Sequence, residues 1–474
     1  MNVSLRSKLL PRTERSLLSS TNLLHAVSDD SEVECTEDNI IIDELTELEP
    51  TSVILRYCKR KFLRPYVCIL GLVGLRPNAV DVDLSTLLGH LQSIIVLVLL
   101  IGGYTLQYMS GFRRDRGFLQ PEHPANGDEA QSGFSTTTMS SSSALGVSSS
   151  ISITNTTAGT VMRAIMGNSG EAIFIYIIPA LLHLVGYVIA VYIYRFADNE
   201  HLQCLIERVF ILCATPRRLV ATLWVYFVLG ALWLAGSTVY IWLLANEQPV
   251  PTQLKWTEEL GPSGQNCVRC LLSVALFFHD LAQMVIIASY SLTCYLLRCY
   301  LQGLKEKLLL HTIEPLNWMR EICEFRKLLH HLNGKVSAPV ACLTLLNVSY
   351  TFTSVVHLFR DLNTCPIGVF SFTVANLLLW LLISLTPFFQ AASLTVTCRR
   401  TQTCGHLISI RPFVHRNTSS EDLNTVLLYA SSLQMSAKLF RMPISAHYLC
   451  FFMFVCVISI LTFGMCLSFT IGGI

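Results

Sequence analysis

The sequence predicts an all-α polytopic membrane protein with seven transmembrane helices, its N-terminus in the cytosol and its C-terminus outside the cell. Three observations lead to this fold class. Apolar residues make up 52% of the 474 residues and charged residues only 14%, too few charges to cover a soluble domain of this size. Apolar windows recur at the length that a bilayer-spanning helix needs. Lysine and arginine alternate between rich and poor loops, as in multi-pass proteins of the plasma membrane.

Seven windows of about 20 mostly apolar residues with charged flanks qualify as spans. They lie at 84–109, 172–197, 219–244, 271–300, 337–359, 367–395 and 444–471. No other apolar stretch of this length remains in the sequence. We therefore divide the chain into a disordered acidic cytosolic tail, 1–52, and a seven-helix transmembrane domain, 53–474.

The distribution of basic residues predicts the orientation. Of the 34 lysines and arginines, 27 precede the first span or lie in the second, fourth and sixth loops. The other seven include a cluster at 113–116 in a long first loop, and long loops carry little weight in the positive-inside rule. The near-zero net charge of +2 gives no reason to expect nucleic acid as a partner.

The segments between the spans have their own signatures. Residues 53–80 mix apolar and basic side chains, which fits either an interfacial helix or an ordinary positive flank of the first span. The first outside loop is rich in Ser and Thr and holds a glycosylation sequon at Asn155. After Pro315, apolar residues recur at helical spacing and extend the fifth span into the cytosol. A capping box at 419–422 begins a helical apolar stripe that is predicted to run to Phe440.

The sequence gives no indication of an enzyme. Phosphate-binding glycine loops, HExxH, nucleophile elbows and paired catalytic carboxylates are absent from it. We therefore expect no catalysis, no cofactor and no metal.

Polar residues inside the spans are the better lead, because an intramembrane carboxylate is costly and normally faces a cavity or a partner. His279, Asp280 and Gln283 lie in the outer half of the fourth span, and His183 lies at similar depth in the second. Two interpretations compete: a ligand pocket that opens outward, or a buried polar cluster that joins helices. At comparable depth the fifth and sixth spans add further candidate ligand-binding residues, namely Tyr350, Ser354, Asn376 and Trp380.

The last span carries a stripe that becomes small and polar toward the outside and that includes Ser459, Thr462 and Cys466. Such a stripe either lines a pore with a hydrophobic constriction or lets neighbouring helices approach closely.

These features together resemble the gustatory receptor family of the insect chemoreceptor superfamily. The resemblance rests on seven spans, a cytosolic N-terminus, a short fifth outside loop, cytosolic helical extensions and a C-terminus shortly after the last span, and it covers residues 60–474. The stretch from Arg64 to Arg76 is similar to the family segment before the first span. The family's C-terminal signature reads Thr-Tyr, five hydrophobic residues and Gln-Phe, whereas this chain has Thr462-Phe463, four residues and Ser468-Phe469.

The resemblance implies a homo- or heterotetramer with related subunits, in which the last helices surround a central cation pore. It also implies that a small-molecule tastant or other chemical ligand binds in the outer half of the bundle, and that cytosolic helices form the subunit contacts. Thr462 and Ser468 match signature positions, and Ser459 and Cys466 join them by helical spacing. The expected function is a chemosensory, ligand-gated, non-selective cation channel. The alternatives are a seven-helix receptor or co-receptor without a channel, and a transporter that uses Asp280 and His279 as a relay.

Overall fold

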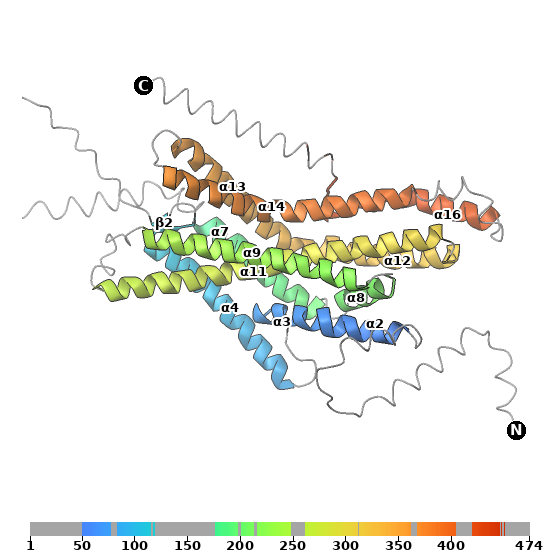
Figure 1. Cartoon of the computed structure of the whole chain (residues 1–474), viewed down its shortest axis with the longest axis horizontal. Coiled ribbons are helices and arrows are strands. Elements are labelled where there is room, and N and C mark those ends of the chain that lie inside the picture. Colours follow the sequence, from blue (N-terminus) through green and yellow to red (C-terminus); the bar gives the residue numbers. More distant parts are fainter. Residues whose placement is uncertain are drawn as a thin grey trace, which may run out of the picture. The chain divides into compact units, whose positions relative to one another are not determined.

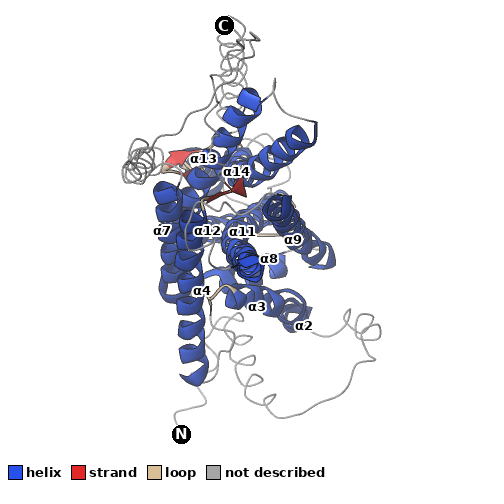
Figure 2. Cartoon of the chain, turned by 90° about the vertical axis from the view of Figure 1, so that its left-hand side faces the viewer, coloured by secondary structure: helices blue, strands red, loops and turns tan. Residues whose placement is uncertain are grey.

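The computed structural model describes residues 50–76, 83–114, 117–118, 176–197, 201–212, 216–247, 261–310, 312–361, 367–403, 420–445, 447 and 450. The chain divides into two compact units, Met1–Val53 and Ile54–Ile474. The first unit corresponds to the predicted acidic tail, which lies almost entirely outside the described residues. In the second unit, helices account for nearly all of the described secondary structure (Figure 2).

Six helices among the described residues are long and apolar enough to cross a membrane. They correspond to the first six predicted spans and appear along the bundle in Figure 1. The helices concerned are α4 Asp83–Ser110, α7 Ile178–Tyr192 with the π-helical turn η5 Ile193–Ala197, α9 Pro216–Glu247, α11 Gly261–Leu309, α13 Ser337–Asp361 and α14 Ile367–Gln402. The fifth apolar stretch, Leu316–Val355, also includes most of the helix that precedes α13. The predicted seventh span, 444–471, lies outside the described residues apart from its first few positions.

The fourth span, α11, is the centre of the bundle. It packs against α9, α14, α4 and α13, and it also contacts α8 (His201–Leu212) and α12 (Pro315–His331). Of the residues in its most apolar stretch, 67% are buried, against 22% in α9. A helix that is apolar on all sides is expected in such a central position. Polar side chains on α11 are therefore forced to find partners inside the bundle.

The residues before the first span are helical, as the interpretation of an interfacial helix requires. They comprise α2 Pro50–Cys58, a π-helical turn η3 Lys59–Leu63 and α3 Arg64–Leu72. Cys58, Phe62 and Tyr66 are buried at intervals of four, and the rings of Phe62 and Tyr66 pack on Phe227 of α9. Burial raises the pKa of the Cys58 thiol to about 12, and the carboxylate of Glu207 adds to the rise.

The predicted helical extension of the fifth span is confirmed. Helix α12 begins at Pro315, where proline is favoured in the first turn, and continues through the π-helical turn η6 Leu332–Val336 into α13. Helix α16, Ser420–Ser432, packs against α12 and α14.

The prediction that the next stripe stays helical as far as Phe440 was wrong. Helix α16 ends at Ser432, and two short antiparallel strands, β3 Lys438–Leu439 and β4 Met442–Pro443, follow. The reason is tertiary: Asn333 of η6 accepts the Lys438 N–H at 2.8 Å, and the Thr395 hydroxyl of α14 accepts the Ala437 N–H at 3.1 Å. These side chains satisfy the backbone groups that a helix would have paired locally.

Candidate functional site

Asp280 lies inside the helix bundle and is fully paired there. One carboxylate oxygen accepts a short hydrogen bond from Nη2 of Arg114 in a buried ion pair. The other accepts the hydroxyl of Ser237 on α9 at 2.6 Å. The side chains of Asp280 and Arg114 are 0% and 2% exposed. The intramembrane charge that the sequence indicated is therefore neutralised by a second charge from the same chain.

Arg114 reaches Asp280 because the chain turns back over the bundle directly after the first span. Helix α4 ends at Ser110, and Gly111 adopts φ +62°, a conformation that glycine takes without steric cost. The two-residue strand β1, Phe112–Arg113, then pairs with β2, Gly117–Phe118. Phe112 is fully buried in a small cluster with residues of α9 and α11. This anchored hairpin places the next residue, Arg114, in the bundle.

Two aromatic rings complete the surroundings of the Arg114 guanidinium. Its carbon Cζ lies 5.1 Å from the ring centroid of Trp380 and 6.0 Å from that of Tyr350, within the range of cation–π attraction. The two rings are 4.7 Å apart. The indole N–H of Trp380 donates to Asn376 at 2.7 Å, and Asn376 donates to Ser354 at 3.0 Å. We call Arg114, Asp280, Tyr350 and Trp380 the guanidinium cage.

A second cluster, of two histidines and a tyrosine, lies beside the cage. His279 bonds through Nε2 to the carbonyl oxygen of Leu100 on α4 at 3.0 Å. Its ring centroid lies 4.3 Å from that of Tyr104 and 5.2 Å from that of His183. The Tyr104 hydroxyl and Nδ1 of His183 are 2.9 Å apart. This cluster joins α4, α7 and α11, as the interpretation of a buried polar cluster predicted.

Gln283 extends the polar residues toward the fifth span. Its amide nitrogen donates to the side-chain oxygen of Asn347 on α13 at 2.6 Å. Asn347 also begins a glycosylation sequon, Asn347-Val348-Ser349, but it is fully buried within α13 and therefore out of reach of glycosylation.

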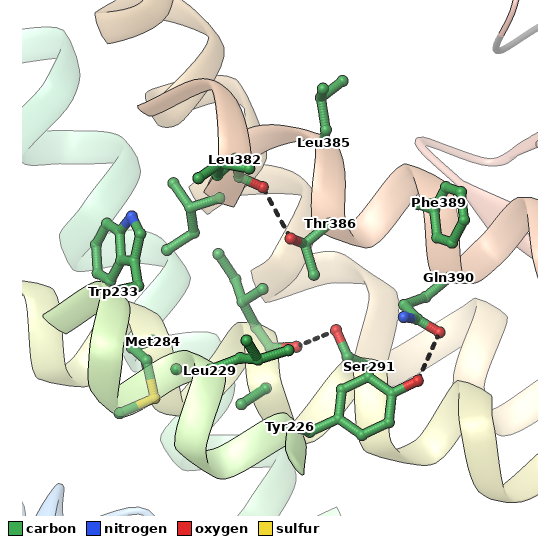
Figure 3. Close-up of a pocket in the computed structure, with 14 residues that line it drawn as sticks. Tyr226, Leu229, Trp233, Met284, Ser291, Leu382, Leu385, Thr386, Phe389 and Gln390 are labelled. Atoms are coloured by element: carbon green, nitrogen blue, oxygen red, sulfur yellow. Dashed lines mark hydrogen bonds between the residues drawn. The ribbon is translucent and has the colours of Figure 1, made fainter. Parts of the chain in front are cut away.

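An apolar groove of about 430 Å³ begins one helical turn from the guanidinium cage, between α9, α11 and α14. Leu229, Met284 and Phe389 supply much of its apolar wall (Figure 3). In Figure 3 the indole of Trp233 lies at one end of the groove, and the hydrogen-bonded pair Tyr226 and Gln390, 3.5 Å apart, lies at the other.

The groove and the cage meet at two tryptophans. The rings of Trp233 and Trp380 are 6.2 Å apart in an edge-to-face arrangement. Trp233 is also fixed by a 2.9 Å hydrogen bond from its indole N–H to the carbonyl oxygen of Leu379 on α14. A molecule in the groove that contacts Trp233 would therefore be one side chain away from the cage.

The structure brings all seven predicted ligand-binding residues into this region. Each lies in the cage, in the histidine cluster or in the hydrogen bonds that support them: His279, Asp280, Gln283, Tyr350, Ser354, Asn376 and Trp380. The predicted pore residues Ser459, Thr462, Cys466 and Ser468 lie outside the described residues, as does Asn155.

Sequence reasoning missed Arg114, Ser237 and Asn347 as members of the site. Arg114 counted as an ordinary loop charge, although an intramembrane Asp indicates a cationic partner and Arg114 lies only four residues beyond the first span. Ser237 and Asn347 gave no distinguishing signal, because serine and asparagine are common in membrane helices. Within the described ranges, no group of three or more His, Cys, Asp and Glu could hold a metal ion.

No protein-family model matches this chain, and no curated protein matches it.

Proposed function

We propose that this protein is a chemosensory receptor of the gustatory type that acts as a ligand-gated, non-selective cation channel in the plasma membrane. The observation that carries the proposal is the apolar groove, which meets a buried polar network through the contact between Trp233 and Trp380. The resemblance described for the sequence supplies the class of activity.

The groove suits a small organic molecule. Its lining residues lie at the middle and toward the inner ends of the predicted spans, so this ligand site is not in the outer half that the resemblance implies. Its volume of about 430 Å³ falls within the range of ligand pockets, which are mostly apolar with a few placed polar groups. The polar groups here are the Tyr226 and Gln390 pair at one end and the hydroxyls of Ser291 and Thr386 along the wall. Both hydroxyls already donate to carbonyl oxygens of their own helices, so they offer mainly acceptor capacity to a ligand.

The polar network gives a route by which binding can alter the bundle. Its hydrogen bonds and ring contacts connect α4, α7, α9, α11, α13 and α14. A ligand that changes the position of Trp233 acts on Trp380 and, through it, on the Arg114 and Asp280 pair. Gating requires that the ligand bind the open arrangement more tightly than the closed one.

The burial of Arg114 supports the proposed orientation with a cytosolic N-terminus. The cluster at 113–116 was the main contrary observation to the positive-inside pattern. A guanidinium that is paired with Asp280 inside the bundle is not a free loop charge and does not count toward that rule.

We place the pore on the last span, 444–471, with Ser459, Thr462, Cys466 and Ser468 along it, and we propose a tetramer of identical or related subunits around a central cation path. These assignments rest on the resemblance and on helical spacing alone. The alternative of a receptor or co-receptor without a channel predicts ligand binding with no current.

A relay transporter that uses Asp280 and His279 receives less support from the geometry. Asp280 bonds to Arg114 and Ser237, whereas His279 bonds to the carbonyl oxygen of Leu100. The two residues thus bind different partners, and no hydrogen bond among the described residues joins their side chains.

Two experiments test the proposal. Tags after Met1 and Ile474, stained in intact and permeabilised cells, test the orientation, and only the C-terminal tag should be accessible in intact cells.

Ligand screens by patch clamp then compare Leu229→Trp, which fills the groove, with Leu232→Trp, a control on the same helix whose exposed side chain does not line it. We expect the first variant to lose its ligand response at least tenfold and the second to keep it. Equal responses in both variants would remove the groove from the proposal, and the absence of current with any ligand would favour the receptor without a channel.

A further inference from the structure

The guanidinium cage combines a carboxylate with two aromatic rings around one organic cation. Asp280 supplies the opposite charge, and Trp380 and Tyr350 present ring centroids at 5.1 and 6.0 Å from the guanidinium carbon. Proteins that recognise organic cations use this combination of groups. We propose that the cage is a recognition site for an ammonium or guanidinium group of a ligand, and that Arg114 occupies it as an intramolecular competitor.

The acidic and aromatic part of the cage is held in place independently of Arg114. Asp280 is fixed by the Ser237 hydroxyl at 2.6 Å, and Trp380 is fixed by Asn376 at 2.7 Å. These residues lie on the long helices α9, α11 and α14. The site is therefore pre-organised, and little rearrangement is needed to bind another cation in place of Arg114.

Arg114 itself is held less completely than a structural buried arginine. Within the described part of the chain, only its Nη2 atom forms hydrogen bonds, to Asp280 and, at 3.5 Å, to the carbonyl oxygen of Leu276. Its Nε and Nη1 atoms are buried and have no hydrogen-bond partner among the described residues. Buried polar groups normally find partners, and each one that does not weakens the arrangement. A ligand cation that satisfies more of its donors can compete with it.

The secondary structure that carries Arg114 also differs from that of the other cage residues. It lies on the hairpin that follows Gly111, and not within a helix. Withdrawal of Arg114 thus needs a movement of this hairpin relative to its buried anchor Phe112, whereas Asp280 and Trp380 stay in place on their helices. The ligand that fits carries one ammonium or guanidinium group and a flat apolar body, which could extend along Trp233 toward the groove.

This inference rests on the proposed function for its biological meaning, because it names the ligand class of the receptor, but its test measures binding and needs no current. The probes are phenylguanidine and phenylurea, which share shape and differ in charge. Thermal unfolding of the purified full chain in detergent is followed by tryptophan fluorescence over a range of probe concentrations. The variants are Arg114→Gln, which vacates the cage, Asp280→Asn, and the double variant.

We expect phenylguanidine to raise the unfolding midpoint of Arg114→Gln with an apparent affinity at least tenfold tighter than for the wild type, where Arg114 competes at a high effective concentration. Phenylurea should have no effect on any form. The double variant, which lacks the carboxylate, should not respond to either probe. The inference is overturned if the folded Arg114→Gln protein does not respond to phenylguanidine, or if the wild type and the double variant respond as strongly.

If Arg114→Gln does not yield folded protein, its purification in the presence of each probe decides the question. Recovery of a monodisperse protein with phenylguanidine but not with phenylurea supports the cage, and recovery with neither overturns it. Binding of phenylguanidine without any ligand-gated current would support the cation site and refute the channel. A current gated by neutral ligands, with no binding of phenylguanidine, would support the channel and refute the cation site.

Discussion

The variant Asp280→Asn tests whether Asp280 and Arg114 form a buried ion pair or lie in a polar pocket that water fills. The substitution keeps the shape of the side chain and removes its charge, so the guanidinium of Arg114 is left buried without a counter-charge. Breaking a buried pair in this way costs roughly 3 to 5 kcal/mol of unfolding free energy. The same change at a solvent-exposed pair costs less than about 1 kcal/mol, because water screens the interaction. The two values are far enough apart to decide between the interpretations.

Removing both charges should restore part of the lost stability. In the double variant of Arg114→Gln and Asp280→Asn no uncompensated charge remains in the bundle, so we expect its loss to be smaller than the sum of the single losses by about 2 kcal/mol or more. A control is Glu324→Gln on α12, whose 2.8 Å pair with Lys327 is largely exposed, and its loss should stay below about 0.5 kcal/mol.

The assay is equilibrium unfolding in mixed micelles, monitored by tryptophan fluorescence, for the wild type, both single variants and the double variant. Losses that add to within about 0.5 kcal/mol would refute the coupling between Arg114 and Asp280. A loss below about 1 kcal/mol for Asp280→Asn alone would place its carboxylate in contact with water.

Three further predictions concern local packing, backbone strain and thiol reactivity. Gly103→Ala should destabilise the bundle by roughly 1 to 3 kcal/mol, because the added Cβ would lie 2.5 Å from Nε2 of His279. The neighbouring Gly102→Ala should be neutral or stabilising by up to about 1 kcal/mol, since nothing lies within 4 Å of its Cβ, and equal losses at both glycines in the unfolding assay would contradict this packing. Arg441→Gly should stabilise the chain by roughly 1 kcal/mol by relieving a φ of +61°, and a lowered unfolding midpoint would show that the arginine side chain matters more than the strain. Because its pKa is raised to about 12, Cys58 should react with N-ethylmaleimide roughly three orders of magnitude more slowly than an ordinary thiol at neutral pH, and rapid modification of the folded protein in mass spectrometry would refute its burial.

The sequence predicted the members of the candidate site that lie on α11 and α14, but not Arg114, and it did not predict how Asp280 is paired. Depth within the spans grouped His279, Asp280, Gln283 and Trp380, and the structure places these residues in one connected region. Depth could not tell whether Asp280 faces a ligand or a partner, because that depends on which side chain approaches from another segment. Here the partner is 166 residues away along the chain.

The sequence by itself determined the helical membrane architecture, because a helix satisfies its own backbone in lipid and a run of apolar residues is enough to define it. The first six predicted spans correspond to α4, α7, α9, α11, α13 and α14. Only the tertiary structure decided that the helix ends at Ser432, that Arg114 neutralises Asp280, and that a groove lies between α9, α11 and α14. Each of these depends on contacts between residues far apart in the chain, and such contacts form only when the helices pack.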